Sequence, residues 1–325
     1  MCTALTWNNG DFYFGRNMDI GYNFGERVVV TPRGYEIRLK TKNTIRTKYA
    51  IIGMASVVEN YPLYAEAMNE KGLCIAGLNF PNNAYYPPHE VEGKHNITPY
   101  ELTLYLLGCL TSTSEARVIL ENVSILGIRF RNDIPLATLH FMLSDRERSI
   151  VVEQTREGLK IYDNPLGVMT NNPTFDFHLT NLNNYLSCSP IESTNHLTNL
   201  TSLAPLGHGS GGLGLPGDST TVSRFVRTVF NKSHSFCTKN EEDNLSHFFH
   251  MLDNVSVVRG CAVSLDNTAD YTTYASCMNV SRGIFYYKTY ENNRITAIRL
   301  TDKNSSAKAL STYELQTKQD ISFVN

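Results

Sequence analysis

The second residue of the chain, Cys2, carries a thiol that can act as a nucleophile. By composition alone, the more common interpretation is a small buried apolar residue in a first strand. Bacterial processing removes an initiator methionine when the next residue is small, which would leave Cys2 with a free α-amine. Such an amine titrates near ~8 and can accept the thiol proton directly or through water. One residue would then supply both the nucleophile and the base for acyl transfer.

Two charged residues follow in the segment F-G-R-N-M-D, which contains Arg16 and Asp19. A hairpin that turns at residues 8–11 would bring both of them back beside Cys2. A cation at that place stabilises a thiolate. A carboxylate there can orient the amine through a charge-assisted hydrogen bond.

Other sequence patterns that could form a binding or catalytic site are weaker indications. Residues 207–217 read GHGSGGLGLPG and contain G-x-G-x-x-G, but no strand leads into the motif and Pro216 prevents a helix from starting there, so a flexible loop is favoured. His247 and His250 lack a third ligand for zinc. No pair of carboxylates shows the spacing of a glycosidase. We therefore expect neither a metal nor a cofactor.

Five motifs, in order along the chain, carry a resemblance to a known family. They are M-C-T-A, F-G-R-N-M-D, A-G-L-N-F-P, T-N-N-P-T-F-D and G-L-P-G-D followed by S-R-F-V-R. Together they resemble the choloylglycine hydrolase family, and especially its bile salt hydrolase branch. The similarity continues to the tail Y-Y-K-T-Y-E-N-N and so spans essentially the whole chain.

The resemblance implies a complete catalytic set and a substrate. The nucleophile would be Cys2, completed by Arg16, Asp19, Asn79, Asn171 and Arg224. The implied activity is hydrolysis of the amide between a bile acid and glycine or taurine, through a thioester that other amines could also attack. The implied fold is a four-layer αββα sandwich of two antiparallel sheets, and the implied assembly is a homotetramer.

Two alternatives stay open. The penicillin V acylase branch shares the implied fold and nucleophile but tends to have Tyr in place of Asn79, so Asn favours bile salts. A steroid-binding protein with a decayed site is the non-enzymatic alternative, and the intact set argues against it.

Matching positions also suggest substrate contacts. Met18, Val58, Phe130 and Ile134 are candidates for the steroid pocket, although Val58 and Ile134 could equally be ordinary core residues. His208, at the start of the Gly-rich segment, is a candidate for the conjugated group. Its imidazole adds little positive charge compared with the guanidinium of an arginine, so we expect a preference for glycine over taurine unless His208 simply faces solvent.

Composition and the N-terminal sequence limit the partners and the cellular location that we expect for the protein. The 325 residues include 29 Lys and Arg against 31 Asp and Glu, a net charge of −2 that makes nucleic acid an unlikely partner. No apolar run reaches the ~18 residues of a membrane span. The N-terminus lacks the pattern of a secretory signal, and seven widely spaced cysteines form no disulfide framework, so a bacterial cytoplasmic location is expected.

Consecutive β-like runs with clustered helices indicate an α+β domain with antiparallel sheets. Helices are predicted over 98–110, 114–122, 176–186, 218–230 and 241–255, with Thr98, Ser114 and either Asp218 or Ser219 as N-caps. Residues 188–217 form a long loop that we expect to serve assembly or selectivity. No linker divides residues 1–325, so a single domain is expected.

Overall fold

The computed structural model describes residues 1–41 and 44–325. Two large antiparallel sheets dominate it. The first contains six strands in the order β14 (Val168–Met169), β1 (Cys2–Asn9), β2 (Asp11–Ile20), β15 (Tyr271–Asn279), β16 (Ile284–Thr289) and β17 (Thr296–Arg299). The second contains eight, in the order β13 (Gly158–Asp163), β12 (Ser149–Thr155), β11 (Leu139–Ser144), β8 (Cys74–Asn79), β7 (Tyr61–Asn69), β6 (Ile51–Val58), β3 (Arg27–Thr31) and β18 (Ser311–Tyr313).

Two small sheets complete the strands that the structure describes. One pairs β4 (Glu36–Arg38) with β5 (Thr44–Arg46) in antiparallel fashion, and the other pairs β9 (His95–Ile97) with β10 (Val123–Ile125) in parallel. The helices are α1 (Pro99–Cys109), α2 (Thr113–Leu120), α3 (Phe175–Asn181), α4 (Thr221–His234), α5 (Glu241–Asp253) and α6 (Asp302–Ser305). Single 3₁₀ turns occur at Leu182–Tyr185 and Ser210–Gly212.

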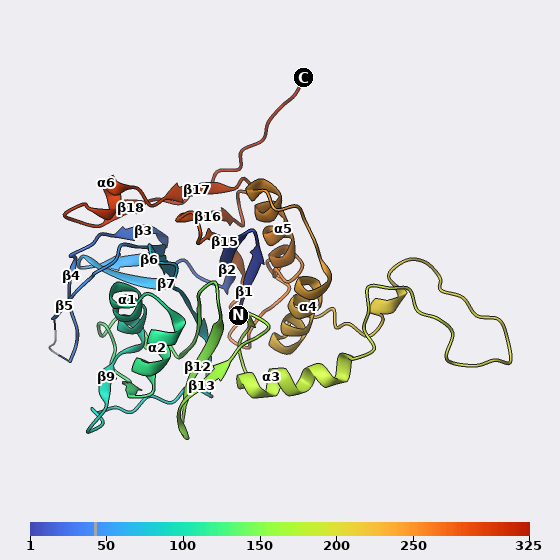
Figure 1. The fold of residues 1–325 in the computed structure, drawn as a ribbon, viewed down its shortest axis with the longest axis horizontal. Coiled ribbons are helices and arrows are strands. Elements are labelled where there is room, and N and C mark those ends of the chain that lie inside the picture. The colour runs from blue at the N-terminus through green and yellow to red at the C-terminus, as the bar shows by residue number, and fades with distance from the viewer. Residues whose placement is uncertain (42–43) are drawn as a thin grey trace.

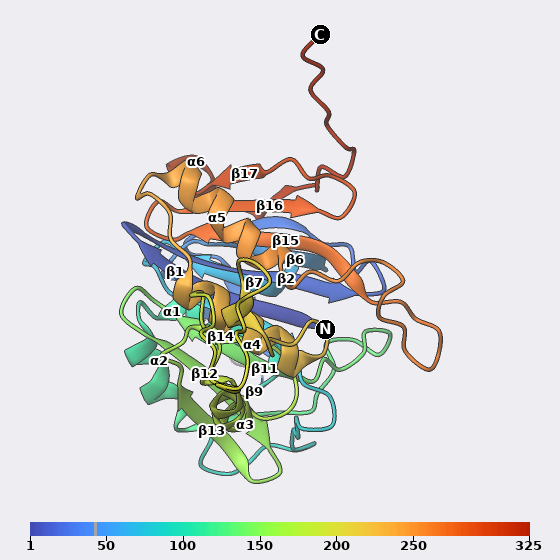
Figure 2. The same ribbon diagram turned by 90° about the vertical axis from the view of Figure 1, so that its right-hand side faces the viewer.

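The elements form four layers. The helices α1 and α2 cover the outer face of the eight-stranded sheet, and α4 and α5 cover the outer face of the six-stranded sheet (Figure 1; Figure 2 shows the view turned by 90°). The predicted αββα sandwich is therefore confirmed. Because β2 is buried on both faces from Phe12 to Asp19, its sequence shows little of the alternation of a half-exposed strand.

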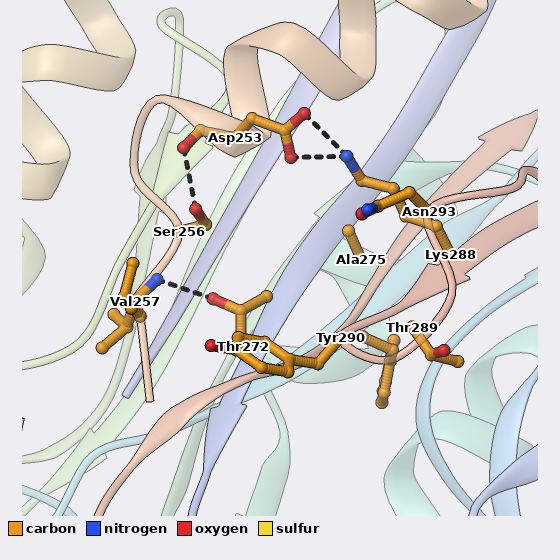
Figure 3. Close-up of a pocket in the computed structure, with 11 residues that line it drawn as sticks. Asp253, Ser256, Val257, Thr272, Ala275, Lys288, Thr289, Tyr290 and Asn293 are labelled. Carbon is orange, nitrogen blue, oxygen red and sulfur yellow. Dashed lines mark hydrogen bonds and ion pairs between the residues drawn. The ribbon is translucent and has the colours of Figure 1, made fainter. Parts of the chain in front are cut away.

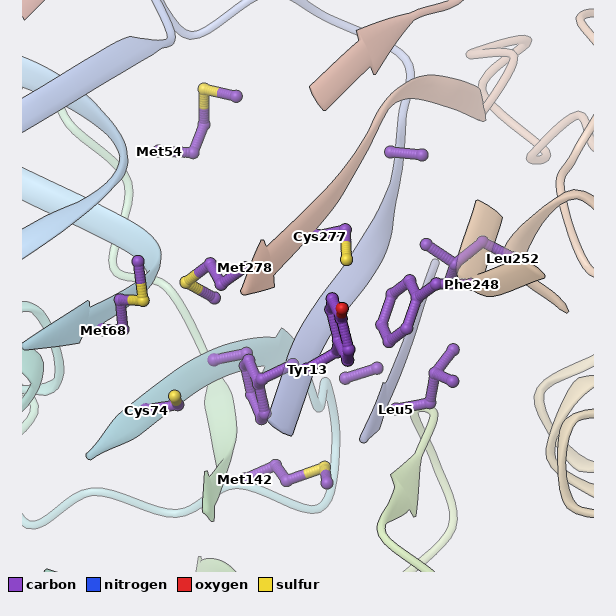
Figure 4. Packing of buried hydrophobic residues seen from close by; sticks show 14 of the residues in the cluster. Leu5, Tyr13, Met54, Met68, Cys74, Met142, Phe248, Leu252, Cys277 and Met278 are labelled. Carbon is purple, nitrogen blue, oxygen red and sulfur yellow. The ribbon is translucent and has the colours of Figure 1, made fainter. Parts of the chain in front are cut away.

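Methionine side chains fill much of the space between the sheets. Met54, Met68 and Met142 of the eight-stranded sheet pack toward Met278 of the six-stranded sheet (Figure 4). On the other face of the six-stranded sheet, Tyr13 packs against α5, for example against Phe248 (Figure 4). The unbranched methionine side chain adapts to irregular gaps between twisted sheets.

Three of the five predicted helices begin at the predicted residue or next to it. The helix α1 follows Thr98 as predicted, and the Glu101 carboxylate accepts the Thr98 amide at 3.0 Å. Helices α3 and α5 also begin within a residue of the predicted positions. The predicted caps of α2 and α4 are wrong, however, as described next.

Two N-caps differ from prediction because a neighbouring hydroxyl takes the role. The Ser112 hydroxyl, not that of Ser114, accepts the amide that caps α2. Thr220 caps α4, whereas Asp218 accepts the Thr220 amide at 2.8 Å and the Ser223 hydroxyl at 2.7 Å. These hydrogen bonds lower the pKa of Asp218 to about 2.

Candidate active site

Cys2 begins β1 and lies directly opposite Met18 of β2. The hairpin turns at Asn9–Gly10–Asp11, and Gly10 adopts the positive φ of +79° that this turn requires. Opposed residues point to the same face, so the Cys2 Sγ lies 3.9 Å from the Met18 Sδ. The predicted return of this strand to Cys2 is confirmed.

Alternation along β2 sends Arg16 and Asp19 to opposite faces. Arg16 points between the sheets, on the same side as Cys2, where it is fully buried. Its Nη1 donates to the Gly77 carbonyl at 2.7 Å and lies 3.7 Å from the Glu66 carboxylate. The guanidinium therefore links the two sheets.

The electrostatic balance around Arg16 keeps its charge. Burial acts to lower the pKa of Arg16, but Cys2 and Glu66 oppose this and raise that pKa above its ordinary value. Burial also raises the pKa of Glu66, against the effect of Arg16 and of the Tyr274 and Ser276 hydroxyls, each of which donates to it at 2.9 Å. A permanent cation thus lies on the side of the thiol, where it can stabilise a thiolate.

Asp19 points to the other face, toward α4. Its Oδ1 accepts the Thr272 hydroxyl at 2.6 Å, and its Oδ2 is buried without a hydrogen-bond partner among the residues that the structure describes. Strand β15 has a bulge between Thr272 and Tyr274, which shifts its register opposite Asp19. Thr272 also lines a small cavity between β15, β16 and the end of α5, where its hydroxyl accepts the Val257 amide (Figure 3).

Arg224, in the first turns of α4, ties the start of β1 to the end of β14. Its Nη1 donates to the Cys2 carbonyl and to the Thr3 hydroxyl, the latter at 2.7 Å, and its Nη2 donates to the Asn171 Oδ1 at 2.8 Å. The same Nη1 lies 3.9 Å from Asp19. Burial lowers the pKa of Arg224, with Asp19 acting in the opposite direction.

Asn171 lies just beyond β14 and contacts the nucleophile directly. Its Oδ1 accepts the Cys2 amide at 2.7 Å, and its Nδ2 donates to the Asn79 carbonyl at 2.7 Å. One N–H of the Asn171 amide thus has a partner, and a primary amide has two. Asn79 ends β8 with its side chain exposed, 3.4 Å from the Thr138 hydroxyl.

The six predicted residues therefore lie together. Hydrogen bonds and one ion pair link Asn171 to Cys2, to Arg224 and to the main chain of Asn79, and link Arg224 to Asp19. Arg16 joins them through Met18, which contacts both its guanidinium and the thiol. The sequence is matched over residues 2–313 by the model of the linear amide C–N hydrolases of the choloylglycine hydrolase family. The chain belongs to the choloylglycine hydrolase family.

Relatives in this hydrolase family are similar in sequence over the full length of the chain. The bile salt hydrolase/transferase of Lactiplantibacillus plantarum is 42% identical, and that of Clostridium perfringens is also 42% identical, with all of each chain covered. A solved structure of a variant conjugated bile acid hydrolase from Clostridium perfringens superposes with a TM-score of 0.94 over 100% of both chains. The penicillin V acylase of Agrobacterium tumefaciens shares the fold, at a TM-score of 0.75, 22% identity and coverage of 96% and 90%.

The residues predicted to line the substrate pocket fall into two groups in this family member. Met18 lies beside Cys2, as described above. Val58 ends β6, whereas Phe130 and Ile134 lie in the loop that follows β10, and all three are half-buried. An ion pair of 3.0 Å between Arg131 and Glu59 joins this loop to the end of β6. No contact links these three residues to Cys2 in the part of the chain that is described, so their role in binding stays a prediction.

The Phe130 ring has clear surroundings. Its centroid lies 5.1 Å from that of Tyr61 and 5.1 Å from that of Tyr100, and the Lys40 ammonium lies 5.4 Å above the ring. The position is therefore an aromatic cluster at the surface rather than part of the central core.

His208 is fully exposed on the long loop, where it pairs with Glu192. The loop extends far from the rest of the chain (Figure 1). Within one chain the structure therefore does not bring His208 to Cys2, and its contact with substrate stays a prediction.

Sequence reasoning missed Glu66, Thr3 and Thr272, which hold the predicted residues in place. Glu66 alone carried a signal, because a single carboxylate within the apolar run YPLYAEAM requires a buried partner. Among the described residues, no cluster of three or more His, Cys, Asp and Glu side chains could hold a metal ion. None of the described helices combines the length and apolarity needed to cross a bilayer.

Proposed function

We propose that this chain hydrolyses the amide bond between a bile acid and glycine or taurine, with Cys2 as nucleophile. The observation that carries the proposal is the connected cluster of Cys2, Arg16 and Asn171 in a chain that is 42% identical, over its full length, to bile salt hydrolases. Asp19, Asn79 and Arg224 complete the proposed set.

Activation requires removal of Met1, which at present forms a peptide bond with the Cys2 nitrogen. Met1 extends the pairing of β1 with β2, because its carbonyl accepts the Asp19 amide at 3.0 Å. The Cys2 nitrogen already lies 2.7 Å from the Asn171 Oδ1. Asp19 lies on the neighbouring strand, and its Oδ2 accepts no hydrogen bond from the described residues and lies 3.9 Å from the Arg224 Nη1. It would add negative charge near a charged amine at this place.

The proposed reaction begins when the Cys2 Sγ forms a bond to the acyl carbon, and its proton passes to the α-amine. The carbonyl oxygen becomes an oxyanion, which the second N–H of Asn171 and a donor of Asn79 stabilise. One such donor contributes about 3 kcal/mol to lowering a barrier of this type.

Collapse of the tetrahedral intermediate breaks the C–N bond, and the α-amine returns the proton to the departing glycine or taurine nitrogen. The thioester then reacts with water, which the same amine deprotonates, to release the bile acid and the Cys2 thiol. Another amine that reaches the thioester in place of water would give a new amide, and we propose this transfer as a side activity.

We further propose that the chain assembles as a homotetramer through the loop at residues 188–217. Large apolar side chains on this loop are exposed in a single chain, among them Leu197, Leu200 and Leu206. A cluster of this kind is expected to be covered by another protein surface.

The test compares the wild type with Cys2→Ser, using glycocholate and taurocholate and measuring free bile acid by liquid chromatography and mass spectrometry. Intact mass first establishes that Met1 has been removed. We expect Cys2→Ser to fold and to lose activity by more than about 1,000-fold, because a hydroxyl is a much poorer nucleophile beside this weak base. Cys261→Ser, which changes an exposed cysteine, is the matched control and should keep full activity.

The outcomes separate the alternatives. Efficient cleavage of penicillin V with little cleavage of either bile salt would favour the acylase. Tight binding of bile salts by the wild type without turnover would favour a steroid-binding protein. Full activity after complete alkylation of Cys2 would exclude the proposed mechanism.

A further inference from the structure

Two buried histidines lie behind Asn171 and hold its main chain. The Nε2 of His178, on α3, lies 2.9 Å from the Asn171 carbonyl oxygen, and the Nε2 of His140, on β11, lies 2.9 Å from the Thr170 carbonyl oxygen. A carbonyl oxygen only accepts, so both Nε2 atoms carry hydrogen and donate. Two consecutive carbonyls of one segment are therefore each held by an imidazole.

His140 is itself held on several sides. Its Nδ1 lies 3.0 Å from the Glu153 Oε1, and both side chains are almost completely buried. Glu153 also accepts the Phe175 amide at the start of α3, at 3.1 Å and 3.3 Å. The Phe80 ring stacks on the imidazole, with centroids 4.3 Å apart and planes inclined by 5°. Phe80 directly follows Asn79, and His140 holds the residue before Asn171. The stacking contact therefore links the main chains of the two proposed oxyanion donors, Asn79 and Asn171.

His178 acts as a neutral donor. Burial lowers its pKa to about 4, and the neighbouring charges of His140 and Arg224 act in the same direction. Its Nδ1 is buried with no hydrogen-bond partner among the described residues, so the ring makes a single hydrogen bond, the one to the Asn171 carbonyl. The ring also packs against Phe225, with centroids 4.8 Å apart, next to Arg224 on α4.

Each nitrogen and oxygen atom of Asn171 has a hydrogen-bond partner, although one N–H of its side-chain amide stays free among the described residues. The position of the side chain therefore depends on the position of the main chain. Its amide nitrogen donates to the Thr221 hydroxyl at 2.8 Å, and its side chain contacts Cys2, Asn79 and Arg224. The free N–H of this side chain can meet an oxyanion only if the main chain stays in place. A displacement of about 1 Å at such a donor can cost about 100-fold in rate.

We propose that His140 and His178 are positioning residues for the reaction, which hold the Thr170–Asn171 main chain so that the Asn171 amide meets the developing oxyanion. Neither imidazole contacts the reacting atoms. This inference rests on the proposed function, because it assigns the two histidines to the same amide hydrolysis.

The first test compares His178→Leu, which removes the donor at similar size, with His178→Gln, which retains an N–H. Hydrolysis of glycocholate is measured together with alkylation of Cys2 by iodoacetamide, a displacement at carbon that forms no oxyanion. We expect kcat of His178→Leu to fall at least tenfold, with KM within threefold and the alkylation rate within twofold of wild type. His178→Gln should recover most of kcat.

A double-mutant cycle with Asn171→Ala separates positioning from general damage. In that background the histidine has no donor to position, so adding His178→Leu should change kcat by less than twofold. An equal loss in both backgrounds, or alkylation slowed in proportion to kcat, would overturn the inference. An unchanged kcat in His178→Leu would overturn it as well.

If His178→Leu does not fold, His140→Gln carries the same test. It keeps a donor toward Thr170 but loses the contact with the Glu153 carboxylate, and we expect kcat to fall three- to tenfold at an unchanged alkylation rate. No fall in kcat would overturn the inference. A wild type that is alkylated at Cys2 yet cleaves no bile salt would instead refute the proposed function.

Discussion

The buried cluster around Cys2 and the loop at residues 188–217 differ in what holds them. In the cluster, Arg224 and Asn171 each bond to segments that are far apart in the chain, such as β1 and the end of β8. In the loop, the hydrogen bonds are mostly internal, for example between Ser193 and Ser210 or between Asn195 and Thr198.

This difference indicates which region has its geometry fixed by contacts within a single chain. Apart from the exposed Asn79, the cluster is buried and its charges lie near opposite charges, so its geometry follows from the two sheets and α4 alone. The loop exposes its leucines and bonds mainly to itself, so the rest of the chain does little to fix its conformation. We therefore expect changes in the cluster to act on each chain separately, and changes in the loop to act through assembly.

Among variants that keep the Cys2 nucleophile, the largest effect should come from Arg224→Lys. A lysine ammonium cannot reproduce the forked contacts to Cys2, Thr3 and Asn171, so we expect activity to fall about 100-fold. Loss of these buried hydrogen bonds should also lower the free energy of unfolding by about 3 kcal/mol. Steady-state kinetics and urea denaturation measure the two effects. Arg227→Lys, on the same helix, is the control, and equal losses in both variants would contradict the special role of Arg224.

A second effect, of about 2 kcal/mol, should appear in the pH dependence of stability. Lys232 lies in the last turn of α4, and its ammonium donates to the Thr6 hydroxyl at 2.9 Å and to the Gly167 carbonyl at 3.3 Å. Burial lowers its pKa to about 7, whereas an unfolded lysine titrates near ~10.4. Above pH 7 the unfolded chain binds a proton that the folded chain has lost, so the free energy of unfolding rises with pH.

Urea denaturation of the wild type and Lys232→Met at pH 7 and pH 9 measures this slope. The wild type should gain about 2 kcal/mol relative to the variant over that interval, from this one group. Lys303→Met, which changes an exposed lysine, should follow the wild type at both values. Parallel curves for the wild type and Lys232→Met would show that Lys232 does not titrate in this range.

The smallest effect on the chemistry should come from deleting residues 195–203 of the loop. If the loop acts through assembly, the deletion weakens the tetramer and lowers activity by up to about tenfold, which corresponds to about 1.4 kcal/mol. Size-exclusion chromatography and kinetics at several protein concentrations measure both. The rate of Cys2 alkylation should stay unchanged, since the cluster is complete in one chain. An unchanged tetramer would contradict the role in assembly.

Features that depend on neighbours in the chain were predictable from the sequence. The turn at residues 8–11 follows from Asn, Gly and Asp, and it places Arg16 and Met18 beside Cys2. The start of α1 at Thr98-Pro99 and the apolar face of α5 follow from helix capping and from the 3.6-residue period. The candidate catalytic set came from motifs shared with a family, not from spacing, since Asn79 and Asn171 lie far apart in the sequence.

What only the tertiary structure decided depends on how the two sheets stack. The partner of Arg16 is Glu66, which also accepts hydrogen bonds from Tyr274 and Ser276, more than 200 residues further along the chain. No local pattern indicates such a contact, because it requires the neighbouring strands β2 and β15 of one sheet to stack over β7 of the other sheet. The same holds for His140 and His178, whose bonds to successive carbonyls exist only once α3 and β11 have packed around Asn171. Propensity and turn chemistry act over a few residues, whereas the register of stacked sheets is set by the burial of whole faces.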